Sequence, residues 1–227
     1  MELELRTDNP AHRVRYPSIP TVTKQVVAAE EISDLLARAP SARLSDMVLF
    51  AILTGLRRGE ICGLRWTDID LANRRIDVSR QMVHGPGTVL EGVPKTASSR
   101  RMVPLTTQTV ELLERQPRSS QYVFCTSSGT AVRPDHLTRD FAKMRRGTAW
   151  ASVRFHDLRA TFISLMLQAS VDVRTVQEVV GHSSADMTLQ IYARSNVAQK
   201  LAAADRLSDR LSEATVRHTH STEITGD

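Results

Sequence analysis

The segment TGLRRGEICGLRW, residues 54–66, lies between a helical part of the sequence and a strand-rich part. Gly55 predicts a sharp end to the preceding helix, and a short helix that carries Glu60 should follow. Arg57 stands at the start of this short helix with Glu60 one turn further on, where a carboxylate can hold a guanidinium or a histidine in place. Taken alone, the segment is more typical of a helix–turn–helix corner with an exposed arginine pair.

The sequence before this segment predicts an extended arm and two helices. Residues 1–28 are polar, contain three prolines and show no helical stripe, so we interpret them as an arm or linker. A helix is expected at about 29–38, where Pro40 stops it, and a second at about 42–55. The second helix should bury one apolar face, formed by Leu44, Met47, Val48, Ala51 and Ile52.

After the segment, the sequence changes to period-two runs and then returns to helical patterns. The alternating runs at 75–78 and 101–105, with turn-like stretches at 85–87 and 97–99, predict a three-stranded antiparallel sheet within residues 68–105. The fold class is therefore α+β and mostly helical. Further helices are expected at about 107–115, 134–146, 157–169, 173–180, 186–191 and 196–214, with Asp172 and Ser184 as N-caps.

Composition indicates a packed domain with an affinity for polyanions. Hydrophobic residues make up 41% of the 227 residues, and the formal net charge is +5. Arginine matches phosphate oxygens with a planar fork of donors, although GC-rich codon usage explains an arginine excess equally well. Cys62 and Cys125 adjoin apolar residues and favour a reduced cytosolic protein, and no membrane span or secretory signal peptide is recognisable. Only four of the 30 basic residues are lysines: Lys24, Lys95, Lys143 and Lys200.

The segment HDLR, residues 156–159, places two cationic side chains at the start of a helix. His156 and Arg159 are three residues apart and therefore share a helix face. Free N–H groups at a helix N-terminus attract anions, so the added histidine and arginine predict a phosphate site. The competing interpretation, favoured when the segment is taken alone, is a capped amphipathic helix with a surface arginine.

Two more segments carry candidate residues. In VGHSSADMTLQIYAR, residues 180–194, His182 follows a helix end and Tyr192 ends the next helix. Each of these two residues by itself is equally well explained as a loop histidine or a half-buried tyrosine anchor. In VPKTASSRRMVPL, residues 93–105, Lys95 precedes a predicted hairpin turn, where a lysine is usually only solvated.

Taken together and in this order, the four segments resemble the tyrosine recombinases of the phage integrase type. The resemblance rests on an arginine in TGLR-x-x-E, a lysine before a VPL strand, His-x-x-Arg, Gly-His and a tyrosine ten residues later. It covers residues 28–200. The chain departs from the family in lacking its amino-terminal DNA-clamping domain, and Asn9-Pro10-Ala11 resembles the linker that follows that domain.

The resemblance implies a role for each candidate residue. Tyr192 would be the nucleophile that forms a 3′-phosphotyrosine, and Lys95 the general acid for the departing 5′-oxygen. The physical properties of Arg57 and Arg58 do not rank them, and the family pattern selects Arg57. Tyr16 and Tyr122 are the rival nucleophiles, but neither has a nearby Gly-His. The remaining assignments are Arg57, Arg159 and His182 on the non-bridging oxygens, His156 beside the tyrosine proton, and Glu60 as support.

The resemblance also implies an organisation and partners. Residues 29–215 would form the catalytic domain, residues 1–28 a remnant of the interdomain linker, and residues 216–227 a disordered tail. The expected partner is double-stranded DNA at an attachment or core site, bound as a homo-tetramer by a chain that is mostly monomeric when free, with a DNA-bending accessory factor as a further candidate. The helix at 196–214 would dock on a neighbouring protomer. No cofactor or metal is expected, and the bacterial cytoplasm or nucleoid is the expected location.

Several functional alternatives stay open at this point. A type IB topoisomerase shares the phosphotyrosine chemistry, although its motifs are spelled differently. A basic DNA-binding fragment with little turnover by itself, and a phosphate-ester hydrolase that uses the Arg/His cluster, are the other two. Within the family, Xer-like and transposon recombinases carry the same motifs as phage or prophage integrases, of which the last is our preferred interpretation.

Overall fold

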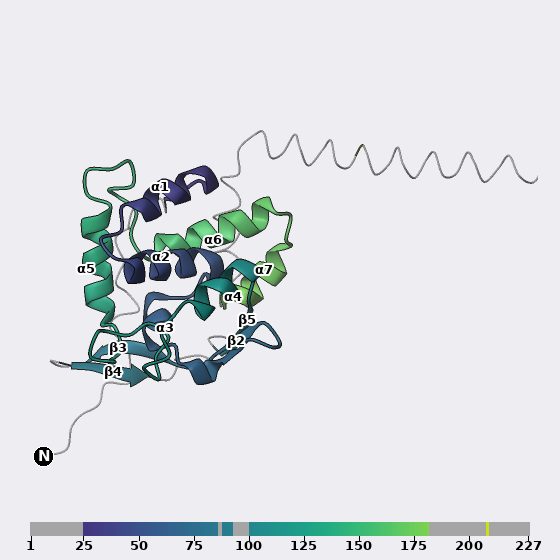
Figure 1. Ribbon diagram of the computed structural model, residues 1–227. Helices are drawn as coiled ribbons and strands as arrows, with labels where there is room; N and C mark the ends of the chain where they lie inside the picture. The colour runs from purple at the N-terminus through teal and green to yellow at the C-terminus, as the bar shows by residue number, and fades with distance from the viewer. Residues whose placement is uncertain (1–24, 86–87, 93–99, 182–207, 209–227) are drawn as a thin grey trace, which may run out of the picture.

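The computed structural model describes residues 25–85, 88–92, 100–181 and 208. A layer of helices covers a base of short strands (Figure 1). In chain order the elements are η2 (Ala29–Glu31), α1 (Ile32–Ala37), α2 (Ala42–Thr54), α3 (Arg58–Gly63), η3 (Trp66–Asp68), β1 (Ile69–Asp70), β2 (Arg75–Val78), β3 (Gln81–Gly85), β4 (Thr88–Gly92), β5 (Arg101–Pro104), α4 (Thr107–Glu114), α5 (Pro134–Met144), α6 (Asp157–Gln168) and α7 (Val173–Val180).

The central helix α2 begins and ends where local chemistry requires. The Ser41 side chain accepts a hydrogen bond from the backbone N–H of Leu44 and caps the first turn. Gly55 ends the helix in the left-handed region, with φ at 62°, as its position in the sequence predicts. The predicted apolar face is buried, and α2 packs against α6, α4 and α1.

The strands form two sheets rather than the single predicted one. An antiparallel sheet of three strands has the order β1-β2-β5, and its register pairs Ile76 with Val103. Strands β3 and β4 form a separate antiparallel hairpin, which the sequence analysis did not separate from that sheet. Its pattern is hard to detect because α3 packs directly on the β3 backbone: a Cβ on Gly59 would lie 2.6 Å from the Met82 carbonyl oxygen.

The later helices largely match their predicted ranges. Helix α7 spans the predicted residues, and Asp172 caps it by accepting a hydrogen bond of 2.9 Å from the Thr175 N–H. Helices α4, α5 and α6 end one or two residues before the predicted limits. The predicted helices at 186–191 and 196–214 lie outside the described residues, apart from Ser208. No helix in the described part of the chain is long and apolar enough to cross a membrane.

Gly55 joins α2 to α6 as well as ending a helix. A Cβ on Gly55 would lie 2.4 Å from the Phe162 ring, and Phe162 belongs to the buried core. The backbone therefore needs glycine both for its left-handed conformation and for the close approach of α6. This close contact fixes the position of the following residues, among them Arg57.

We predict that Gly55→Ala lowers the free energy of unfolding by about 2 to 4 kcal/mol, because backbone strain adds to overpacking. The matched control is Gly147→Ala, since Gly147 has φ at 71° but open space around its Cβ position. The control should cost about 1 kcal/mol, the backbone contribution alone. Denaturant unfolding measures both, and equal losses would show that contact with Phe162 adds nothing.

Candidate functional site

The turn after Gly55 places Arg57 against Glu60. Arg57 is the N-cap residue of α3, and its backbone N–H donates to Glu60 Oε2 at 2.7 Å. Its guanidinium also donates to Glu60 Oε1 at 2.9 Å, so the contact expected between Glu60 and a guanidinium is present. Arg58 takes another direction and donates to Thr138 Oγ1 on α5 at 2.5 Å. The two adjacent arginines are therefore distinct, and Arg57 is the one that pairs with Glu60.

A second guanidinium on Glu60 comes from Arg101, which the sequence analysis did not single out. Arg101 begins β5, its side chain is 5% exposed, and it donates to both carboxylate oxygens of Glu60, at 3.0 and 2.9 Å. The sequence does carry a signal for it. Strand alternation places Arg101 on the same face as Val103, which is buried, and an arginine at an inward position needs a partner.

The third guanidinium belongs to Arg159 in the first turn of α6. Arg159 is only 3% exposed and donates to the Gly55 carbonyl oxygen at 2.7 Å. The interpretation of HDLR as a capped helix with a surface arginine is therefore wrong. His156 immediately precedes α6 and its side chain is exposed. The helix start thus has a buried arginine and an exposed histidine.

The C-terminal end of α7 gathers the three guanidiniums. Strand β5 packs against this helix, which ends at Gly181 in the left-handed conformation. Carbonyl groups at a helix C-terminus lack partners within the helix and carry partial negative charge, so they attract cations. Arg101 Nε (2.7 Å), Arg159 and Arg57 (3.0 Å) donate to the carbonyl oxygens of three successive residues, Val179, Val180 and Gly181 respectively.

The cluster carries more positive than negative charge in a buried place. Among the described residues, three guanidiniums face one carboxylate, that of Glu60. Burial, and then the charges of Arg57 and Arg101, lower the pKa of Arg159 to about 9, with Glu60 opposing the shift. The lowered pKa means that the surroundings destabilise the charged form of Arg159, and a bound anion would stabilise that charged form. The arrangement can therefore attract and hold an anion such as a phosphate.

Glu60 is ionised in spite of its burial. Burial alone would raise the pKa of its carboxyl, but the hydrogen bonds and charges of Arg101 and Arg57 lower it below its usual value. A carboxylate with a lowered pKa stabilises the fold at neutral pH, and this contribution is lost as the pH falls through that pKa. Glu60 thus links the stability of the domain to the integrity of the cluster.

Three of the candidate residues, Lys95, His182 and Tyr192, lie outside the described residues. The structure consequently brings together Arg57, Glu60 and Arg159 from the predicted set, and adds Arg101. In the sequence, His182 follows Gly181 directly, and Lys95 precedes β5. The rival nucleophile Tyr122 is described, and Arg65 lies over its ring at 5.5 Å.

Comparison with known proteins finds a family model described as the phage integrase family, which matches residues 25–199. A relative from Caldanaerobacter subterraneus subsp. tengcongensis, named tyrosine recombinase XerC-like, is 29% identical over 206 residues, which make up 79% of this chain and 53% of the relative. The chain thus spans a little over half the length of this curated relative.

Solved structures share the fold. The Tn1549 transposon integrase in complex with transposon right end DNA matches with a TM-score of 0.68 and 23% identity, over 85% of this chain and 69% of that chain. A lambda integrase tetramer bound to a Holliday junction matches with a TM-score of 0.50 and 20% identity, over 73% and 47% of the two chains. At these identities the likeness establishes the fold.

We predict that Glu60→Gln lowers the free energy of unfolding by about 3 kcal/mol or more near pH 7, because the buried Arg101 and the half-buried Arg57 lose their anionic partner. The gap between the two proteins should narrow as the pH falls through the lowered pKa of Glu60, where the native carboxyl takes up its proton. The control is Glu114→Gln at the exposed end of α4, which should change stability by less than about 0.5 kcal/mol. A gap of constant size at all pH values would contradict an ionised Glu60.

Proposed function

The chain belongs to the phage integrase family, and from this membership we propose that it is the catalytic domain of a site-specific recombinase. The domain would cut and rejoin DNA through a 3′-phosphotyrosine at Tyr192. The observation that carries the proposal is the convergence of Arg57 and Arg159 on the carbonyl end of α7, one residue before His182. Phage or prophage integration and excision is the preferred setting.

The chemistry demands an anion site of this kind. A phosphodiester repels nucleophiles, and the five-coordinate transition state carries additional negative charge on its oxygens. The excess of guanidiniums over carboxylates in the cluster matches that charge. Because the guanidiniums are fixed by Glu60 and by the α7 carbonyls, little reorganisation is required when the charge develops.

In the proposed cleavage, one bond to phosphorus forms as another breaks. The Tyr192 oxygen bonds to phosphorus and gives up its proton toward His156, while the bond from phosphorus to the 5′-oxygen breaks. Lys95 supplies the proton that the 5′-oxygen takes. Arg57, Arg159 and His182 donate hydrogen bonds to the non-bridging oxygens. Rejoining reverses these steps, since a 5′-hydroxyl attacks the phosphotyrosine and releases Tyr192.

Arg57 suits this role by its exposure as well as its position. Its side chain is 32% exposed, so a DNA phosphate can reach it, whereas Arg159 is only 3% exposed. A guanidinium has five N–H donors. In the part of the chain that the structure describes, the Arg57 guanidinium uses two of them, one to Glu60 and one to the Gly181 carbonyl oxygen. The same guanidinium can therefore be held in place and still donate to a phosphate.

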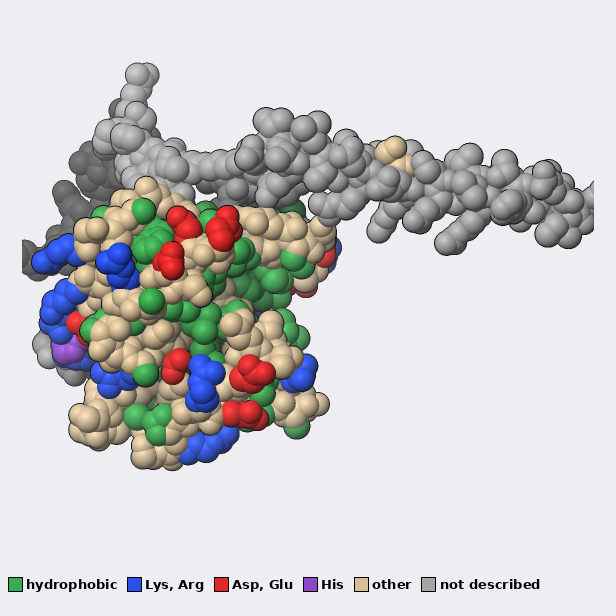
Figure 2. Space-filling view, turned by 45° about the horizontal axis from the view of Figure 1, so that its top comes forward, with side chains coloured by type: hydrophobic (Ala, Val, Ile, Leu, Met, Phe, Trp, Pro, Cys, Tyr) green, Lys and Arg blue, Asp and Glu red, His purple; other side chains and the backbone are tan. Residues whose placement is uncertain are grey.

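A cationic face of α5 supports DNA as the partner. Lys and Arg side chains gather along the left edge of the face in Figure 2, the side on which α5 lies in Figure 1. Such a stripe can follow a phosphate backbone without reading the bases. Its exposed basic members are Arg139 and Lys143 on α5 and Arg146 just after the helix, with the exposed His136 one turn before Arg139.

We propose assembly on DNA for the intact recombinase. The lambda integrase tetramer on a Holliday junction shares this fold, and a tetramer on two duplexes would place one site at each strand exchange point. The segment at 196–214 would then dock on a neighbouring protomer, and the free chain would be mostly monomeric, because one helix buries too little area for a stable dimer. A cytoplasmic or nucleoid location follows from the proposed substrate.

We predict that the chain forms a covalent adduct with nicked duplex DNA that carries its attachment site, and that Tyr192→Phe abolishes the adduct. The substitution removes only the attacking oxygen, so the dissociation constant for DNA should change by less than about twofold. Denaturing electrophoresis detects the adduct. Tyr122→Phe is the control and should retain it. An adduct that persists in Tyr192→Phe and disappears in Tyr122→Phe would reassign the nucleophile, and no adduct with the unaltered chain would refute the proposed activity.

A further inference from the structure

Arg101 has no role in the chemistry described above, yet it is placed at the centre of the cluster. It stands at the first position of β5, faces inward and is almost completely buried. Burying a guanidinium is costly unless every contact is well made, so a strand position of this kind is rarely given to arginine. Among its contacts, two with the Glu60 carboxylate and one with the Val179 carbonyl tie together three elements: α3, β5 and α7.

We propose that Arg101 is a positioning residue for DNA cleavage, which holds the Glu60 carboxylate, and through it the Arg57 guanidinium, in the orientation that presents Arg57 to the phosphate. This inference rests on the proposed function. Arg101 is not assigned to the substrate, because its fork is directed at Glu60 and α7. Its effect on the reaction would pass entirely through groups that it orients.

The geometry of the carboxylate supports this role. Each oxygen of Glu60 accepts one hydrogen bond from Arg57 and one from Arg101. The bonds from Arg57 come from its backbone N–H and from its side chain, whereas Arg101 donates two parallel bonds from one planar group. A parallel pair of this type fixes the plane of a carboxylate, and the plane of Glu60 in turn fixes the position of Arg57 Nη1.

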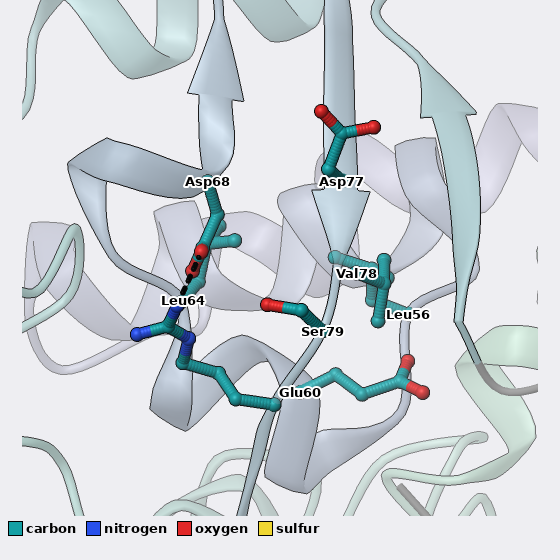
Figure 3. A pocket seen from close by; sticks show the side chains of 8 residues that line it. Leu56, Glu60, Leu64, Asp68, Asp77, Val78 and Ser79 are labelled. Atoms are coloured by element: carbon teal, nitrogen blue, oxygen red, sulfur yellow. Dashed lines mark ion pairs between the residues drawn. The ribbon is translucent and has the colours of Figure 1, made fainter. Parts of the chain in front are cut away.

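The charges around Glu60 support the same role. In the described part of the chain, the charged groups that face it are Arg57 before α3, Arg101 on β5 and Arg159 on α6. A small cavity beside Glu60 is also lined by Asp68, Asp77 and Arg80, and the Asp68 and Arg80 side chains pair with each other at 2.9 Å. Figure 3 shows the Glu60 carboxylate pointing away from those of Asp68 and Asp77.

Loss of Arg101 should therefore have two separable consequences. Glu60 would keep its burial but lose the partner that contributes most to lowering its pKa, so its pKa would rise. As the pH falls through the raised pKa, Glu60 would take up a proton and release Arg57. A lysine at this position would keep the charge, and with it the ionised carboxylate, but would lose the planar fork.

The test compares Arg101→Met and Arg101→Lys with the unaltered chain and with the control Arg100→Met, whose side chain is exposed on the adjacent position. The measured quantity is the rate of adduct formation at saturating nicked DNA between about pH 5 and pH 8, expressed as a ratio to the unaltered chain. We expect Arg101→Met to be about 10- to 100-fold slower at pH 8 and slower still at lower pH. Arg101→Lys should be slower by a factor that does not change with pH, and Arg100→Met should be within about twofold.

A second readout does not depend on activity. Carbon-13 NMR of the Glu60 carboxyl in the free protein should show a raised pKa in Arg101→Met and a nearly unchanged one in Arg101→Lys. The inference would be overturned if both variants formed the adduct at the rate of the unaltered chain. It would also be overturned if Arg101→Met left the Glu60 pKa unshifted and slowed adduct formation by the same factor at every pH. If Arg101→Met does not fold, Arg101→Lys decides: a slower rate with unchanged DNA affinity supports the inference, and an unchanged rate overturns it.

The two proposals can fail separately. If the unaltered chain forms no adduct, the proposed recombinase activity fails, and the NMR titration still decides whether Arg101 controls the ionisation of Glu60. If the unaltered chain forms the adduct and the Arg101 variants match it at every pH, the activity stands and the positioning role fails.

Discussion

The rest of the structure depends on one interaction, the pairing of the buried Glu60 carboxylate with both Arg57 and Arg101. Arg159 lies close to this pairing. Guanidiniums at such short range repel one another, and a buried charge without a partner costs several kcal/mol. One carboxylate and the carbonyl end of α7 offset most of that cost. The fold must therefore bring α3, β5, α6 and α7 to one point.

Local features of the chain meet this requirement one by one. Gly55 allows the turn that sets Arg57 beside Glu60, and its carbonyl oxygen accepts a hydrogen bond from Arg159. The glycines of α3 allow that helix to lie on the β3 backbone, and the register of β5 against β2 turns Arg101 inward. Gly181 ends α7 where its carbonyls can receive the three guanidiniums. Each of these features shapes the fold. Together they hold an excess of positive charge in a fixed place, which suits the negative charge of a reacting phosphate.

Periodicity and capping chemistry allowed α2 and α7 to be predicted closely, because these helices start at the capping residues Ser41 and Asp172, end at Gly55 and Gly181, and bury an apolar face. The separate β3–β4 hairpin was missed because it contacts α3 largely through backbone, which leaves no alternation to detect. Arg101 was missed because charge in a strand normally indicates an exposed position, although its alternation with Val103 places it on the inward face. The meeting of Arg57 and Arg159, which are 102 positions apart in numbering, depends on tertiary packing that no local pattern contains. The roles of Lys95, His182 and Tyr192 remain predictions from the sequence.

The central claim, that the cluster is an anion site built around Arg57, is tested most directly by thermal unfolding in inorganic phosphate and in chloride at equal ionic strength. A ligand that binds only the folded protein raises the midpoint of unfolding. Phosphate should raise the midpoint of unfolding of the unaltered chain by a few degrees. It should raise the midpoint of Arg58→Met equally, because the Arg58 side chain points to α5. In Arg57→Met most of this rise should be lost. An equal rise in Arg57→Met, or loss of the rise in Arg58→Met alone, would contradict the account.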